Sequence, residues 1–267
     1  MIEKRGFLYS PKGKNRTLHI YLPRQYDSSN RRYPVMYFFD GHNLYRDQDA
    51  TYGKSWGLET FLDGWSKDMI IVGLECSHEG NERLDEYSPY TFPMGHWGMV
   101  HGMGEKTMDW IVGEVKPMID REYRTYSFRE ATGIAGSSMG GLMSLYAAAA
   151  YNEVFSKAAC LSSAITPCFQ DMGREILSHR LDADTRVYLS WGTEEAGGTH
   201  PDPAEDFKSH TARCNLAVEA LLRQQQVGVK TYCQRFGRHC EADWEKQVPI
   251  FMNYLWLDGD SPAAKTI

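Results

Sequence analysis

One serine of this chain stands in a pattern that would make it a nucleophile. Gly136-x-Ser138-x-Gly140 is the spacing of a nucleophile elbow, a sharp strand-to-helix turn that holds a serine hydroxyl out of a sheet. The glycines allow close backbone contacts that larger side chains would prevent. A plain glycine-rich turn is the alternative. A phosphate-binding loop would need a Lys-Ser/Thr pair after its glycines, and Gly140-Gly141-Leu142 has none. The predicted chemistry is attack by the Ser138 hydroxyl.

A serine hydroxyl needs a base within hydrogen-bond reach and a third group that holds the base in one tautomer. His239 follows a predicted strand that ends near Phe236, and Glu194 and Glu195 follow one that ends at Trp191. The order serine, acid, histidine is that of the α/β-hydrolases. His239 is therefore the predicted base. Only one of the two adjacent glutamates can hold the imidazole, and a serine–histidine dyad would need neither.

The other histidines are weaker candidates for chemistry. His200 and His210 compete with His239 for the role of base, but neither follows a predicted strand. His96 and His101 are five residues apart, which matches no helical pair of metal ligands, and no carboxylate cluster accompanies them. We therefore predict no metal site and no cofactor.

An acyl-transfer site also needs two N–H donors for the oxyanion. The first is the backbone N–H of Met139, directly after the nucleophile, and the second comes from the loop after an earlier strand. The apolar run 33–39 predicts that strand, and Asp40-Gly41-His42-Asn43 follows it. The amide of His42 is the predicted donor, with a plain strand-ending turn as the alternative. Asn43, in the same loop, is a candidate for the pocket wall.

The elements that must position these residues alternate between strands and helices. This alternation predicts an α/β fold with a central, mostly parallel, twisted sheet and helices on both faces. Trp56, in the first predicted helix, is a candidate for the substrate pocket. Pro117 lies inside another predicted helix and should kink it. The predicted strands cover 6–9, 17–22, 33–39, 69–74, 131–135, 158–164, 186–191 and 229–236, and the predicted helices 55–65, 107–123, 142–149, 214–222 and 244–255.

Helical and strand periodicity both stop between Glu75 and Lys106. A loop of this length is unusual in a compact domain unless it has a function. Its middle part mixes aromatic residues, methionines and glycines, which is typical of a lid or pocket wall in which methionine is the adaptable filler. A packed surface loop is the alternative. Trp97 is the candidate pocket residue of this segment.

Length and charge restrict the class of protein. We predict that residues 1–267 form a single domain, because no linker or repeat interrupts the chain. The formal net charge of -6 argues against nucleic acid or an anionic membrane as a partner, since both are bound through clustered Lys and Arg. A small-molecule substrate is the expected partner.

Cysteine usage and the N-terminus indicate the compartment. The first residues lack the apolar run of a signal peptide, and no apolar stretch reaches membrane-spanning length, which predicts a cytoplasmic protein. The six cysteines form no C-x-x-C and no paired metal spacing, so free thiols are expected. A disulfide between Cys233 and Cys240 stays open.

Six stretches spread over nearly the whole chain carry a family resemblance. They are Tyr33 to Leu44, Arg83-x-x-Glu86-Tyr87-Ser88-Pro89, Lys116-Pro117-Met118-Ile119-Asp120-x-x-Tyr123-Arg124-Thr125, Gly136-Ser137-Ser138-Met139-Gly140-Gly141, Gly192-Thr193-Glu194-Glu195 and Gly237-Arg238-His239-x-Glu241-x-x-Trp244. In these stretches the chain resembles the putative esterase family of the α/β-hydrolase superfamily, the group of esterase D, feruloyl esterases, enterochelin esterases and mycolyltransferases.

The resemblance implies roles for the site residues. Ser138 would be the nucleophile and His239 the base. The acid would be Glu195, because the family places its carboxylate three residues after a strand-ending glycine, where many members carry aspartate. The amides of His42 and Met139 would form the oxyanion hole.

The resemblance also implies an activity. We expect a serine carboxylesterase that hydrolyses short acyl or aromatic esters through a Ser-His-Glu triad and an acyl-enzyme intermediate, without a cofactor. Arg83 would lie near the pocket mouth, in a role that the family does not fix. An acyltransferase is the close alternative. A non-catalytic scaffold is the distant one, since such proteins usually lose the serine or the histidine. The natural substrate and the oligomeric state are not predicted.

Overall fold

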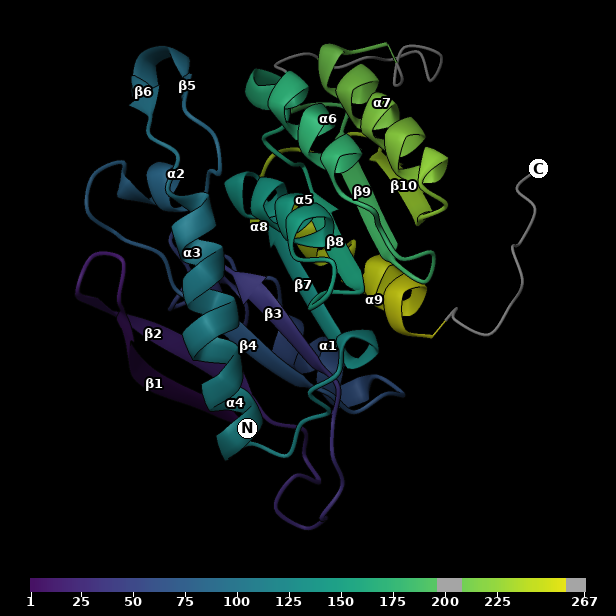
Figure 1. Cartoon of the computed structure of the whole chain (residues 1–267). Coiled ribbons are helices and arrows are strands. Elements are labelled where there is room, and N and C mark those ends of the chain that lie inside the picture. The colour runs from purple at the N-terminus through teal and green to yellow at the C-terminus, as the bar shows by residue number, and fades with distance from the viewer. Residues whose placement is uncertain (196–207, 258–267) are drawn as a thin grey trace.

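A computed structural model describes residues 1–195 and 208–257. Its centre is a twisted eight-stranded sheet with helices on both faces (Figure 1). The predicted α/β architecture is confirmed. In spatial order the strands are β1 (Ile2–Tyr9), β2 (Lys14–Tyr21), β4 (Ile70–Leu74), β3 (Val35–Phe39), β7 (Thr132–Ser137), β8 (Lys157–Leu161), β9 (Arg186–Gly192) and β10 (Gly228–Gln234).

The strands from β4 to β10 run parallel, and only β2 is reversed, since it is antiparallel both to β4 and to the edge strand β1. Parallel strands are covered on both faces, which explains why β3 and β4 read as continuous apolar runs in the sequence. All carboxyl ends of the parallel strands meet at one edge of the sheet. The loops that carry the predicted site residues all leave from that edge.

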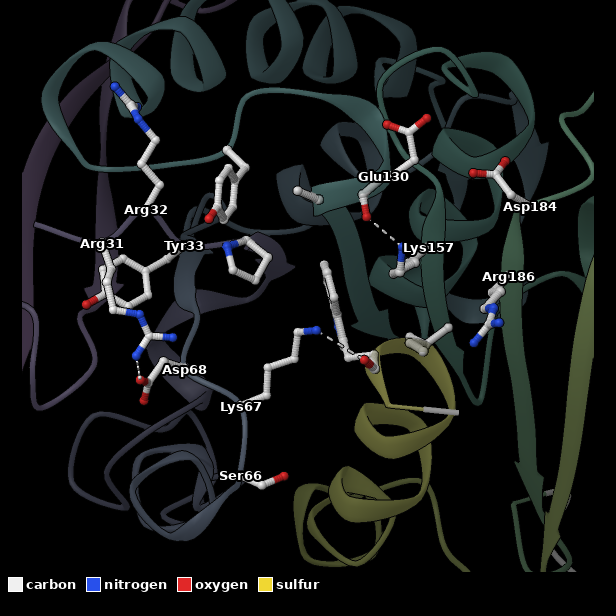
Figure 2. A pocket seen from close by; sticks show the side chains of 15 residues that line it. Arg31, Arg32, Tyr33, Ser66, Lys67, Asp68, Glu130, Lys157, Asp184 and Arg186 are labelled. Atoms are coloured by element: carbon white, nitrogen blue, oxygen red, sulfur yellow. Dashed lines mark hydrogen bonds and ion pairs between the residues drawn. The ribbon is translucent and has the colours of Figure 1, made fainter. Parts of the chain in front are cut away.

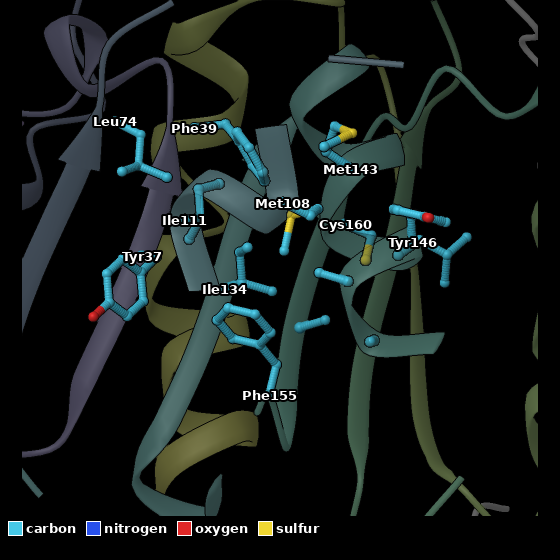
Figure 3. Close-up of a cluster of buried hydrophobic side chains, with 14 of the residues drawn as sticks. Tyr37, Phe39, Leu74, Met108, Ile111, Ile134, Met143, Tyr146, Phe155 and Cys160 are labelled. Atoms are coloured by element: carbon cyan, nitrogen blue, oxygen red, sulfur yellow. The ribbon is translucent and has the colours of Figure 1, made fainter. Parts of the chain in front are cut away.

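Two hydrophobic cores lie on opposite faces of the sheet. Alternate residues of β3 enter each core, with Tyr37 and Phe39 on one side and Met36 and Phe38 on the other. Figure 3 shows part of the larger core. Within residues 1–195 and 208–257, no helix combines the length and the apolar character needed to cross a bilayer. The larger core is covered by α3 (Gly104–Trp110), α4 (Lys116–Glu122), α5 (Met139–Ala150), α6 (Phe169–Ser178) and α7 (His210–Gln224), and the smaller by α1 (Leu58–Gly64), α8 (Glu241–Glu245) and α9 (Val248–Trp256).

The helix predicted over 107–123 is built in three parts. A π-helical turn at Ile111–Val115 joins α3 to α4, and the N–H of Lys116 donates to the carbonyl of Ile111 across the wider turn. Pro117 follows directly. In a regular helix the Pro117 ring would clash with the carbonyl four residues earlier. The wider turn therefore accommodates the proline at this point.

The segment predicted as a loop over 75–106 contains several short elements. It includes α2 (Glu82–Glu86) and a small hairpin of β5 (Phe92–Pro93) and β6 (Met99–Val100), with the 3-10 turn η2 (Gly95–Trp97) between its strands. These elements are too short to show a periodicity in the sequence. The segment is therefore a series of short elements rather than one irregular loop.

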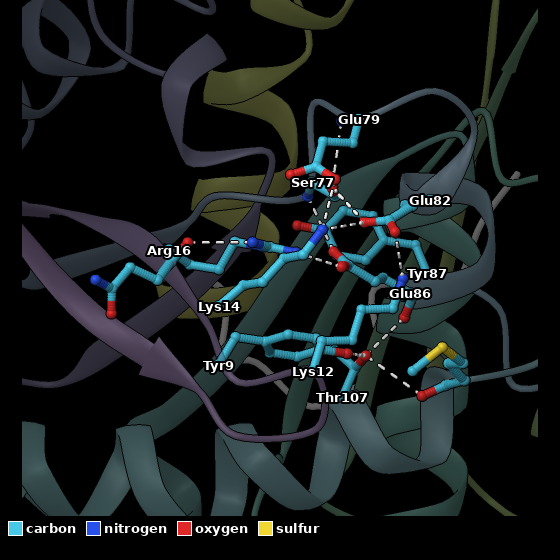
Figure 4. Close-up of polar contacts among 12 residues, drawn as sticks. Tyr9, Lys12, Lys14, Arg16, Ser77, Glu79, Glu82, Glu86, Tyr87 and Thr107 are labelled. Carbon is cyan, nitrogen blue, oxygen red and sulfur yellow. Dashed lines mark hydrogen bonds and ion pairs between the residues drawn. The ribbon is translucent and has the colours of Figure 1, made fainter.

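A buried ion pair attaches this segment to the edge hairpin. Arg16 of β2 lies 2.5 Å from a carboxylate oxygen of Glu86, and both side chains are buried. The other Glu86 oxygen accepts the N–H of Ser77 at 2.9 Å. Lys14 adds contacts to the carboxylates of Glu79 and Glu82 (Figure 4). Because the Glu86 charge is paired and hydrogen-bonded, its burial is tolerated and fixes α2 in place.

All six cysteines are free thiols. Cys233 and Cys240 are half-buried and unbridged, so the disulfide that the sequence left open is not formed. The other four thiols are buried.

Candidate active site

Ser138 lies on a strained turn between β7 and α5, with φ 58° and ψ -121°. A positive φ is rare for a residue with a side chain. A Cβ added to Gly136 would lie 2.6 Å from the carbonyl carbon of Gly140, and one added to Gly140 would lie 2.8 Å from the Cβ of Phe39. Both glycines are therefore required by the closeness of the turn to its surroundings.

The structure distinguishes the two adjacent glutamates. A carboxylate oxygen of Glu195, Oε2, lies 3.5 Å from Nδ1 of His239. The other, Oε1, accepts the hydroxyl of Ser162 at 2.5 Å and the N–H of Gly192 at 2.7 Å. The N–H of Glu194 donates to the carbonyl of Gly237, and among the described residues its side chain makes no hydrogen bond or ion pair with His239. Glu195 is thus the glutamate that faces the imidazole.

A second layer of side chains fixes the Glu195 carboxylate. The indole N–H of Trp244, on α8, donates to the Ser162 hydroxyl at 2.8 Å. The Trp244 ring also packs edge-on against His239, with ring centroids 5.1 Å apart. Ser162 itself has a positive φ of 46° directly after β8. Trp244 stood in a sequence motif without a role, and nothing in the sequence marked Ser162.

Ser138 and His239 line the same cavity of about 430 Å³ at the carboxyl edge of the sheet. Among the described residues no hydrogen bond joins the two side chains. Hydrogen bonds between a nucleophile and its base are often long in ligand-free enzymes and shorten when substrate binds. Most of the residues that line the cavity are polar.

The predicted oxyanion donors lie at the start of two helices. Met139 is the first residue of α5, and His42 is the second residue of the 3-10 turn η1 (Gly41–Asn43). N–H groups at such positions have no acceptor inside their own helix. A Cβ on Gly41 would lie 2.5 Å from the carbonyl carbon of Gly73, so only glycine lets the η1 turn lie this close to β4.

Arg83 holds the turn that carries His42. Its guanidinium donates to both carboxylate oxygens of Asp40, at 2.7 and 2.6 Å. Burial works against the Asp40 charge, but Arg83 outweighs burial and holds the pKa of Asp40 below its usual value. Asp40 has a φ of 58° directly before η1. Arg83 therefore lines the cavity, and the Asp40 carboxylate neutralises its charge.

Only one of the three remaining predicted pocket residues lines the cavity. Asn43 lines the cavity, and its amide donates to Glu241 at 3.3 Å. Burial and the nearby Asp40 charge raise the pKa of Glu241. Trp56 does not line the cavity but is buried in the smaller core, because the aromatic stripe near α1 packs against the sheet. Trp97 is 51% exposed in η2 and also lies outside the cavity wall.

Of the two rival histidines, His210 does not join the site. His210 is the first residue of α7, where its Nε2 lies 3.9 Å from the sulfur of Cys214. His200 lies outside the described residues.

A second and larger cavity, of about 640 Å³, lies at the opposite end of the sheet (Figure 2). Lys157 and Arg186, the first residues of β8 and β9, line it together with Lys67. Burial and the charge of Arg186 lower the pKa of Lys157 to about 8. Open α/β sheets bind their ligands at the carboxyl ends of the strands, so the smaller cavity beside Ser138 is the candidate active site.

Known proteins share this fold and sequence. The chain is 26% identical to the uncharacterised protein YbbA of Bacillus subtilis over 96% of its own length and 97% of that protein. It is 31% identical to the esterase Rv1288 of Mycobacterium tuberculosis over 82% of its length, and spans half of that protein. An IroE-like serine hydrolase of Shewanella oneidensis superposes with a TM-score of 0.76 at 18% identity, over 97% of this chain and 81% of that one. The enterobactin esterase of Shigella flexneri superposes with a TM-score of 0.70 at 16% identity, over 96% of this chain and 59% of that one.

The sequence relatives define the chain as an esterase, which acts on carboxylic esters, and the solved structures share its α/β fold. The profile of the family described as putative esterase matches residues 10–251. The chain belongs to this family.

Proposed function

We propose that the protein hydrolyses short acyl or aromatic esters through Ser138, His239 and Glu195. The observation that carries the proposal is the strained Ser138 turn in one cavity with a histidine whose other face meets a buried carboxylate. Each of these residues follows the end of a different parallel strand. The arrangement fits the division of labour in serine hydrolases, in which nucleophile, base and orienting acid must converge.

In the proposed reaction, Ser138 attacks the ester carbonyl while His239 takes the hydroxyl proton. The oxyanion accepts hydrogen bonds from the amides of Met139 and His42. His239 then passes its proton to the leaving alcohol, and an acyl-enzyme remains. Water, deprotonated by His239, attacks the acyl group and releases the acid, and the proton returns to Ser138. Glu195 keeps the imidazole in the tautomer that both steps need.

Replacing the nucleophile tests the proposal. Ser138→Ala should lower the kcat for p-nitrophenyl acetate by about 10⁴-fold or more, because the proposed acyl-enzyme forms on the Ser138 hydroxyl. Ser144→Ala is a matched control, since Ser144 lies in the same helix and its hydroxyl bonds only to the carbonyl of Gly140. A fluorophosphonate probe should label the Ser144→Ala variant and not the Ser138→Ala variant. Full activity in folded Ser138→Ala protein would refute the proposal.

The cavity lining favours a narrower candidate for the substrate. Asn43, Thr51, Tyr52 and Glu241 offer hydrogen-bonding groups around Ser138. Such a wall suits an ester with polar groups beside the scissile bond better than a long acyl chain. Two proteins of similar structure are the enterobactin esterase of Shigella flexneri and the siderophore hydrolase EstA of Aspergillus nidulans. We therefore propose polar aryl esters, siderophore esters among them, as the preferred substrates.

A substrate series separates the two candidates. Among esters with the same leaving group, kcat/KM should fall as the alkyl chain becomes longer. Hydroxylated benzoate esters should have a higher kcat/KM than these alkyl esters. A steady rise of kcat/KM with alkyl length would contradict the polar candidate and leave the esterase assignment intact.

A further inference from the structure

Two histidines and a cysteine meet beside the nucleophile, and the ester hydrolysis described above gives none of their side chains a role. One ligand atom from each of His42, Cys76 and His78 lies within 4.8 Å of the other two. His42 follows β3, and Cys76 and His78 follow the adjacent parallel strand β4. All three residues line the cavity that contains Ser138. The cluster is therefore a product of the fold at the functional edge of the sheet.

The buried imidazole of His42 has an unused nitrogen. Its Nε2 is hydrogen-bonded to the hydroxyl of Thr51 at 2.9 Å. Its Nδ1 is buried without a hydrogen-bond partner, and His42 is only 7% exposed. A buried polar atom without a partner is uncommon, because its lost hydration is not replaced. The Nδ1 atom of His42 is thus set up to receive a ligand.

The second histidine is oriented in the way of a metal ligand. Nε2 of His78 lies 2.8 Å from a carboxylate oxygen of Glu75, which leaves Nδ1 as its other nitrogen. Metal-binding histidines commonly direct their second nitrogen to a carboxylate or hydroxyl, which fixes the ring. The His42 and His78 rings lie with their centroids 4.7 Å apart at an interplanar angle of 70°. Glu75 and Thr51 thus support the two rings from outside.

We propose that His42, Cys76 and His78 form a binding site for Zn²⁺ that opens into the active-site cavity. Two imidazole nitrogens and one thiolate are ligands that Zn²⁺ prefers, and three protein ligands leave the fourth tetrahedral position open toward the cavity. The thiol of Cys76 is protonated in the metal-free protein, since burial raises its pKa. Its proton passes to the solvent when the zinc–sulfur bond forms. The Glu75 carboxylate balances the charge that the ion brings.

Zinc at this site inhibits ester hydrolysis, a consequence that rests on the proposed function. The ion binds the side chain of the same residue, His42, whose amide is the second oxyanion donor. Its open coordination position takes water or a substrate oxygen and draws it away from Ser138. Occupancy therefore competes with productive binding of the ester.

Calorimetric titration of the reduced protein with Zn²⁺ tests the site without reference to activity. We expect one ion per chain, and a loss of affinity of at least about 10-fold in Cys76→Ser and in His78→Gln, since each removes one of three ligands. His179→Gln and Cys233→Ser are matched controls, because His179 pairs with Glu175 as His78 does with Glu75, and both lie outside the cluster. Unchanged affinity in folded Cys76→Ser and His78→Gln proteins would overturn the site.

Co²⁺ provides an independent signature. Cobalt bound by a thiolate gives a sulfur-to-metal charge-transfer band in the near ultraviolet, which should be present in the parent protein and absent in Cys76→Ser. The Ser138→Ala protein should bind Zn²⁺ as tightly as the parent, so failure of the proposed hydrolysis would leave this result unaffected. A protein that binds zinc through these ligands and keeps full esterase activity would overturn the inhibition and not the site.

Discussion

The Glu195 carboxylate uses its two oxygens for different purposes. Oε1 is held by the Ser162 hydroxyl and the Gly192 amide, which leaves Oε2 to face His239. A carboxylate fixed in this way orients the imidazole without moving itself. Trp244 extends this support, since it bonds to Ser162 and packs on the His239 ring.

This geometry predicts unequal effects of two adjacent substitutions. Glu195→Gln should lower kcat by roughly 10²- to 10⁴-fold, because an amide can stabilise the wrong imidazole tautomer. Glu194→Gln is the matched control and should change kcat by less than about 3-fold, since among the described residues its side chain makes no hydrogen bond or ion pair with His239. Steady-state kinetics on p-nitrophenyl acetate measures both. Equal losses in the two variants would contradict the choice of Glu195.

The sequence could identify single residues only where a motif surrounds them. Ser138 and His239 were predicted because a turn pattern and a strand end mark their positions. The choice of Glu195 over Glu194 rested on the family resemblance alone, because two adjacent identical residues carry no local sign of which one faces the imidazole. Ser162 was missed because its partner Trp244 lies 82 residues away, and no local pattern connects them.

At the level of elements, the close approach of β7 to α5 depends on glycine. Gly136→Ala should destabilise the protein by about 2 kcal/mol or more, because the new Cβ would lie 2.6 Å from backbone atoms that cannot move freely. Gly113→Ala is a contrasting control. Gly113 is exposed in the π-helical turn with no atom within 4 Å of an added Cβ, and alanine there should stabilise by about 0.5 kcal/mol.

Urea denaturation of both variants measures these two changes. A Gly136→Ala protein as stable as the parent would mean that the elbow backbone can relax, contrary to the tight packing described here. The sign of the Gly113→Ala effect reports separately on whether the π-helical turn tolerates a side chain.

Long apolar elements were predictable and short ones were not. The strand predicted at 69–74 is observed as Ile70–Leu74, since a buried parallel strand is a continuous apolar run. The five residues of α2 and the two-residue strands β5 and β6 are too short for a hydrophobic period to repeat within them. The position of α2 depends on the Arg16–Glu86 ion pair, which joins segments 70 residues apart.

For the whole molecule, the two ends of the sheet carry different cavities. The active-site cavity was predictable, because the loops at the carboxyl edge contain recognisable motifs. The larger cavity at the opposite end of the sheet was not predictable. Its cationic side chains come from separate segments around residues 31, 67, 157 and 186, none with a pattern of its own.

Lys157 gives this second cavity a measurable effect on stability. Its pKa is about 8 in the folded protein against 10.5 for an ordinary lysine, so between these values the unfolded chain binds more protons. Stability therefore gains from this group as the pH rises from 8 to 10.5, and the burial cost is fully present below pH 8. Relative to the parent, the free energy of unfolding of Lys157→Met should thus be higher at pH 7 than at about pH 9.5.

Urea denaturation at the two pH values measures this difference, and kcat should stay unchanged because the substitution lies at the far end of the sheet. The hydrogen bonds that Lys157 donates to the Glu130 carbonyl and the Ser156 hydroxyl are lost at both pH values, so their contribution cancels in the comparison. A larger advantage at high pH would show that the Lys157 pKa is not depressed.

The positive φ of Ser138 lowers the stability of the fold at the residue that the proposed hydrolysis needs. A residue with a side chain in this backbone conformation costs the fold about 1–3 kcal/mol, whereas glycine adopts it freely. Asp40, Ser162 and Phe236 also have a positive φ, Asp40 and Ser162 directly after the end of a parallel strand and Phe236 two residues after one. Glycine in place of Ser138 would therefore favour the stability of the fold, whereas the proposed ester hydrolysis needs the serine hydroxyl.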